Sequence, residues 1–211
     1  MAKEIPLTMD DVAGLALIAT FANAEDGTWA PWARELMGYL YAYAPGYTND
    51  EALIQIAKEL GDSNINVANA FVIRARAKDC SLLTGDRVVE LVSQFEDDTS
   101  VHAANLHHNA ARFFLDKPAN DGSYHLAISY LNEAIKRYGM DKNFHHRAAA
   151  NFWKSQAREK LGNLKAATEA MKESVRLWEE QCKLDPTNDD FSKKYKTAKG
   201  WLATLIGEAT S

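Results

Sequence analysis

Two pairs of adjacent histidines are the residues of this 211-residue chain that most readily suggest chemistry. His107-His108 opens the stretch HHNAARFF, and His145-His146 opens the stretch HHRAAANFW. Imidazole is a common ligand of transition metals, so a metal site between the two pairs is one interpretation. Neighbouring residues of a helix point about 100° apart, however, and no Asp or Glu follows either pair at the third or fourth position. We therefore predict no metal and no cofactor. We interpret the histidines as polar side chains that line a groove or solvate the ends of helices.

Basic and amide side chains accompany the histidines on the same two stretches. The chain carries a net charge of −5, yet these stretches hold four of its six histidines and several cations. Arg and Lys pair readily with carboxylates, which makes an acidic peptide or a C-terminal carboxylate the natural ligand. The predicted partner-binding residues are His107, His108, Asn109, Arg112, His145, His146, Arg147, Asn151, Lys154 and Arg158.

The elements that would position these residues recur along the chain. From His102 to Lys183 a histidine-bearing segment, a glycine and a second segment occur twice, with Gly122 and Gly162 forty residues apart. A helix, a glycine turn and a second helix repeated at a fixed period are typical of a stacked helical array. In such an array the second helices pack between neighbouring repeats.

The second segments carry the more specific pattern. After each glycine come a large residue, a small one, a large one and a small one: Tyr124, Ala127, Leu131 and Ala134, then Leu164, Ala167, Met171 and Ser174. This order resembles the second helix of the tetratricopeptide repeat, and Leu184-Asp185-Pro186 resembles the closing signature of that repeat. The period is about 40 residues rather than 34, and 116–121 reads as a loop extension. The resemblance implies two divergent units over 101–187, with first helices that bind a peptide or protein on a concave surface.

The rest of the chain also has helical patterns. Apolar spacing and capping residues predict helices at 8–22, 29–44, 49–60, 64–78, 86–95 and 188–206, and no period-two strand pattern occurs. The predicted fold is all-α, an antiparallel helix-hairpin array (an α-solenoid) of about ten helices. An acidic stretch near residue 98 separates a helical region, 1–98, from the repeats and their capping helix, 99–211, unless the two form one continuous domain.

A helix-turn-helix at 49–80 is the alternative functional interpretation. The segment IAKELGDSNINVANAF would place Asn64, Asn66 and Asn69 near base edges, with Arg74 and Arg76 near phosphates. Against it, Asp62 stands where an apolar residue is normally buried, and the segment is close to neutral. Nucleic acid is therefore the less favoured partner, and self-association through exposed repeat edges is a third hypothesis.

Composition and motifs exclude several other classes. No glycine-rich phosphate loop, Gly-x-Ser-x-Gly elbow or His-Glu-x-x-His motif is present, so we predict no enzymatic activity. Cys80 and Cys182 are far apart and in no Cys-x-x-Cys motif, which favours a reducing compartment. The N-terminus lacks the features of a signal peptide, and the longest apolar stretch is too short to cross a bilayer. We expect a cytoplasmic protein without membrane contact.

Overall fold

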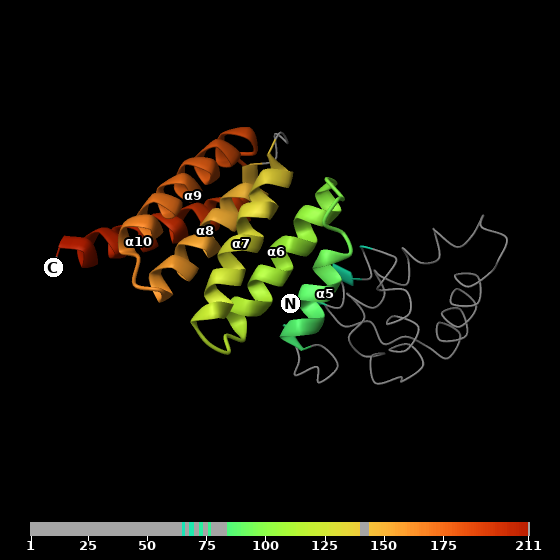
Figure 1. The fold of residues 1–211 in the computed structure, drawn as a ribbon. Helices are drawn as coiled ribbons and strands as arrows, with labels where there is room; N and C mark the ends of the chain where they lie inside the picture. Colours follow the sequence, from blue (N-terminus) through green and yellow to red (C-terminus); the bar gives the residue numbers. More distant parts are fainter. Residues whose placement is uncertain are drawn as a thin grey trace, which may run out of the picture. The chain divides into compact units, whose positions relative to one another are not determined.

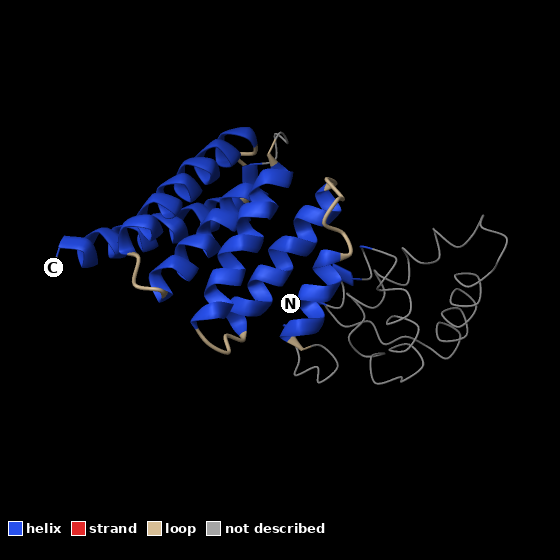
Figure 2. Ribbon diagram, in the orientation of Figure 1, coloured by secondary structure: helices blue, strands red, loops and turns tan. Residues whose placement is uncertain are grey.

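The computed structural model describes residues 84–139 and 144–210, together with six positions between Ile65 and Arg76. Within this part of the chain every regular element is a helix, which confirms the all-α prediction there (Figure 2). Six helices have bounds in these ranges, fewer than the ten or so predicted for the whole chain. The predicted helices at 8–22, 29–44 and 49–60 lie outside the described residues. The six separate positions are all helical and fall inside the predicted helix 64–78.

The helices follow one another with short connections (Figure 1). Their bounds are α5 Gly85–Ser93, α6 Val101–Asp116, α7 Asp121–Tyr138, α8 Phe144–Lys160, α9 Leu164–Leu184 and α10 Asp189–Thr210. Internal contacts divide the chain into two compact units, Met1–Phe95 and Glu96–Ser211. Helix α5 belongs to the first unit, and helices α6 to α10 form the second. The predicted division lay after residue 98.

Local side-chain chemistry explains where the helices begin. Thr84, Ser100 and Asn163 precede α5, α6 and α9, and the side chain of each accepts a hydrogen bond from the backbone N–H three residues later. These N-cap bonds satisfy donors that have no partner inside the helix.

The two repeat glycines have different roles, which corrects part of the prediction. Gly162 ends α8 with a positive φ of 72°, and its N–H donates to the Glu159 carbonyl at 2.8 Å. The next N–H, of Asn163, donates to the Arg158 carbonyl at 2.9 Å, which completes a Schellman motif. Gly122, by contrast, is the second residue of α7 and not a turn residue. Helix α7 begins at Asp121, before the repeat pattern starts, so the turn lies at 117–120.

The second helices bury the residues that the repeat pattern predicts. Three positions of α7 and the three equivalent positions of α9 are all 0% exposed: Ala127, Leu131, Ala134, Ala167, Met171 and Ser174. Tyr124 and Leu164, which start the two patterns, are both half-buried. The alternation of small and large residues therefore corresponds to one equivalent stripe on each of these helices.

The first helices are equivalent at a different spacing from the one predicted. Burial matches when residues 44 apart are compared: Ala104 with Ala148, His107 with Asn151, and Ala111 with Ser155 are all buried. The first helices are further apart in sequence than the second helices because α7 begins three residues before Tyr124, whereas α9 begins at Leu164 itself. The connection from α6 to α7 is also longer than the connection from α8 to α9. His107 is consequently equivalent to Asn151 and not to His145. The two histidine pairs therefore occupy different places in their helices.

Buried hydroxyl groups join α8 to α9. Ser155 Oγ donates to the Ala167 carbonyl at 2.7 Å, and Ser174 Oγ donates to the Ala148 carbonyl at 2.8 Å. Because the earlier residue of α8 pairs with the later residue of α9, the two helices run antiparallel. Ala198 and Leu205 of α10 complete the hydrophobic core of this hairpin. Each helix from α6 to α10 contacts the next one along the chain, and α6 also contacts α8.

Candidate functional site

His107 lies in the interior of the second unit. Its side chain is 3% exposed, and Nδ1 lies 2.8 Å from the Ala103 carbonyl, an arrangement in which Nδ1 carries the proton and donates. The imidazole edge meets the Tyr130 ring at a centroid separation of 5.9 Å. Burial is the main cause that lowers the pKa of His107, and the positive charge of Arg137 adds to it. The neutral imidazole is therefore the form that the fold favours.

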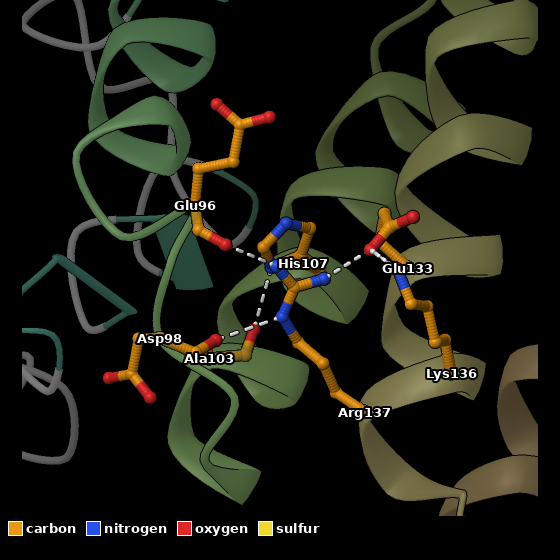
Figure 3. Close-up of polar contacts among 7 residues, drawn as sticks. All are labelled: Glu96, Asp98, Ala103, His107, Glu133, Lys136 and Arg137. Atoms are coloured by element: carbon orange, nitrogen blue, oxygen red, sulfur yellow. Dashed lines mark hydrogen bonds and ion pairs between the residues drawn. The ribbon is translucent and has the colours of Figure 1, made fainter.

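Arg137 connects α7 to the segment that precedes α6 (Figure 3). Its guanidinium donates to the Glu96 carbonyl at 2.7 Å and to the Asp98 carbonyl at 3.0 Å, and it also pairs with Glu133. The Arg137 side chain is only 8% exposed. These bonds hold the acidic stretch 96–98 against α7, which gives a physical reason why the second compact unit begins at Glu96. Arg137 was not among the predicted site residues.

The other three predicted histidines belong to a chain of aromatic ring contacts. His108 meets Tyr138 edge-on at 6.3 Å, and Tyr138 stacks on His146 at 5.0 Å. His146 lies 3.9 Å from His145, and His145 stacks on Phe191 of α10 at 5.5 Å. The structure thus brings three of the predicted histidines close together around Tyr138. The same Tyr138 donates its hydroxyl proton to Asn105 of α6 at 2.7 Å.

A second group of aromatic side chains crosses three helices. The guanidinium of Arg112 in α6 lies 3.6 Å from the ring centroid of Trp153 in α8. Trp153 meets Phe152 edge-on at 5.2 Å, and Phe152 lies 6.3 Å from Trp201 of α10. The Trp201 indole N–H donates to Glu159 at 3.0 Å, and the side chain remains 36% exposed. We call Arg112, Trp153, Phe152 and Trp201 the aromatic face.

Three of the predicted site residues on α8 make contacts within the chain. Arg147 donates to the Gly139 carbonyl at 3.1 Å, and Arg158 donates to the Ala166 carbonyl at 3.0 Å. Asn151 is 7% exposed and donates to the Arg147 carbonyl at 2.9 Å. Arg147 is thereby directed toward the end of α7 and Arg158 toward α9, whereas Asn151 bonds within α8 itself. The basic strip expected on one open surface is therefore divided, and Arg112 is the predicted cation that lies at the aromatic face.

Lys154 differs from the other basic residues of α8. It is half-buried, and neither a hydrogen bond nor an ion pair joins it to any described residue. Burial lowers the pKa of Lys154, and the positive charge of Arg158 one turn later lowers it further. A half-buried ammonium with a like charge beside it is an unfavourable arrangement in the absence of a ligand.

Some site residues were missed because no local pattern marks them. Trp153 and Trp201 lie far apart in the sequence, and only the packing of α8 against α10 brings Trp201 next to Phe152. Within 84–139 and 144–210, no group of three or more His, Cys, Asp or Glu side chains is arranged to hold a metal ion. No described helix is long and apolar enough to span a membrane.

Comparison with known proteins adds no family to this description. The chain matches no protein-family model, no curated protein and no solved structure. The functional argument therefore rests on the residues and contacts themselves.

Proposed function

We propose that the second unit is a helical-repeat interaction module, an α-solenoid of tetratricopeptide-like hairpins, that binds a peptide or protein segment on the aromatic face. The equivalent burial of α7 and α9, the equivalent burial of α6 and α8 at a spacing of 44 residues, and the contact of α6 with α8 support the repeat architecture. Arrays of this kind present equivalent helices along one extended surface. Helices α6 and α8 would be the first helices of two units, and α10 would be the cap.

The observation that carries the proposal is the row of Arg112, Trp153, Phe152 and Trp201 across α6, α8 and α10. Trp, Tyr and Arg are the side chains that most often dominate the free energy of protein binding. A rigid indole offers a large contact area at a small loss of conformational entropy. A partner segment that lies across the three helices would reach all four side chains.

Arg112 supports the acidic partner that the sequence suggested. A guanidinium over the face of an indole can still donate N–H groups to a carboxylate in bidentate geometry. The ion pair of Arg112 with Asp116 is long, at 3.7 Å, and both side chains are partly exposed. Such surface pairs contribute little, about 0–1 kcal/mol, so a partner carboxylate could compete with Asp116. We place this module in the cytoplasm and assign it no catalytic role.

Affinity capture from the source cell, followed by titration of the purified partner, tests the proposal. Trp153→Ala should weaken the measured affinity about tenfold or more, because truncating a central aromatic anchor typically costs over 1 kcal/mol. Arg112→Glu should weaken binding of an acidic partner. Lys172→Ala, at an exposed position of α9, is the matched control and should bind as the wild type does.

Circular dichroism on each variant separates loss of binding from loss of folding. If Trp153→Ala and Arg112→Glu are folded and both bind with wild-type affinity, the aromatic face is not the binding surface. Light scattering on the same samples tests self-association, since assembly through repeat edges would produce a mass that increases with protein concentration.

A further inference from the structure

Lys154 and Arg158 stand one helical turn apart on α8, at positions i and i+4 that share a face. Both side chains are partly buried, and both are cations in a chain whose net charge is negative. Like charges at this spacing repel each other and destabilise a helix. No ion pair within the described part of the chain compensates for either one.

Arg158 is held in place by α9. One Nη donates to the Ala166 carbonyl at 3.0 Å, and the rest of the guanidinium donates to no other described group. Ala166 lies in the first turn of α9, where the helix dipole places a partial positive charge. Arg158 is therefore held beside the positive end of α9.

The nearest acidic residue in the sequence does not offset these charges. Glu159 accepts a hydrogen bond from the Trp201 indole and is directed to the aromatic face. Around α8, Lys154 lies about 100° from Trp153 and about 160° from Phe152, and Arg158 lies about 140° and about 120° from the same two residues. The two cations therefore occupy a different side of α8 from the proposed peptide surface.

We propose that Lys154 and Arg158 form a binding site for an oxyanion, a phosphate or a carboxylate group, beside the first turn of α9. An oxyanion between the two side chains would neutralise the half-buried ammonium and engage the guanidinium N–H groups that make no contact within the described residues. Charge complementarity identifies the ligand class: two cations one helical turn apart, with no carboxylate among their contacts in the described residues. This site goes beyond the proposed peptide surface and does not depend on it.

The test uses inorganic phosphate as the probe and the full chain as the receptor. The melting temperature is followed by circular dichroism while phosphate is increased, with sodium chloride at the same ionic strength as the reference. A ligand that binds the folded state alone raises the melting temperature in a saturable manner. We expect a rise of a few degrees in phosphate beyond the effect of chloride.

Lys154→Met should remove this rise, with an apparent affinity for phosphate at least tenfold weaker. Lys160→Met removes the same charge from an exposed position of the same helix and should keep the wild-type response. If Lys154→Met does not fold, Lys154→Gln is used in its place. The comparison of phosphate with chloride on the wild-type protein tests the site without any variant. The proposal is overturned if phosphate stabilises the wild type no more than chloride does, or stabilises the Lys154 variant equally.

Two further arms identify the source of the oxyanion. A short peptide that contains one phosphoserine and an otherwise identical peptide that contains Ala are each added at saturating phosphate. If the phosphoserine peptide displaces phosphate and the Ala peptide does not, the oxyanion that binds the site is a phosphorylated side chain of a partner. Lack of displacement by either peptide assigns it to a free anion, and both results agree with the oxyanion site.

Discussion

Replacement of His107 by Asn should make the stability of the protein less dependent on pH between about 7 and 5. Burial lowers the pKa of His107 from its ordinary value of 6.5, so the folded protein keeps the imidazole neutral while the unfolded chain takes up a proton. The unfolded state then binds more protons than the folded state, and the free energy of unfolding decreases as the pH falls. The stability from the neutral imidazole is fully present above pH 6.5 and is lost as the pH approaches the lowered pKa.

The magnitude follows from the proton difference between the two states. One proton bound by the unfolded chain alone changes the free energy of unfolding by about 1.4 kcal/mol per pH unit, which is the largest slope that one histidine can produce. Arg137 acts in the same direction as burial, whereas the Ala103 hydrogen bond and the charges of Glu133 and Glu96 oppose it. The slope removed by the substitution is therefore a fraction of that maximum.

Asn is the appropriate replacement because the protein itself uses it at the equivalent place. Asn151 donates to the carbonyl four residues earlier, as His107 does through Nδ1. His107→Asn should keep that hydrogen bond and lose the contact with Tyr130, at a cost of about 1–3 kcal/mol that does not vary with pH. The matched control is His125→Asn, which removes an exposed imidazole from α7.

Urea unfolding followed by circular dichroism, at a series of pH values, measures these slopes for the wild type and both variants. We expect a flatter profile for His107→Asn and a wild-type profile for His125→Asn. Identical pH dependence in all three proteins would refute the reasoning. Titration of the histidine ring protons by nuclear magnetic resonance provides a direct check on the lowered pKa.

Two other predictions address the turn chemistry and the alternative function. Gly162→Ala should destabilise the protein by about 1–2 kcal/mol, because Gly162 has a φ of 72° that side chains with a Cβ disfavour. Gly200→Ala should instead stabilise it by about 0.5–1 kcal/mol, since Gly200 lies inside α10 and a Cβ there meets no atom within 4 Å. Thermal unfolding compares the two variants, and an equal effect of both would contradict this account. A gel-shift series on duplex DNA at decreasing salt tests the helix-turn-helix predicted at 49–80, and we expect no affinity even at low salt, where phosphate contacts are strongest.

The positions of the helices and the buried stripe of the second helices were predictable from the sequence. Helix starts depend on local hydrogen bonds, such as that of Ser100 or Asn163 to the third N–H, and these bonds need only neighbouring residues. The small and large residues of α7 and α9 recur at helical spacing, so the spacing alone identifies Leu131 and Met171 as buried. The Gly162 turn was predictable for the same local reason.

The roles of the first-helix residues were decided by tertiary structure alone. His107 and His145 look equivalent in the sequence, but α7 begins a turn earlier than α9 relative to its pattern, and this shifts the correspondence to His107 and Asn151. The direction of a basic side chain on α8 depends on which helix packs beside it, as the contact of Arg158 with Ala166 illustrates.

The contacts that define the candidate sites join residues distant in the chain. Arg137 binds the Glu96 carbonyl 41 residues away, and Trp201 binds Glu159 across 42 residues. Such pairs form only when the helices have packed, because nothing in the local spacing of either partner specifies the other. The sequence by itself therefore determined the helices and their buried stripe, and the packing of those helices decided which polar and aromatic side chains meet.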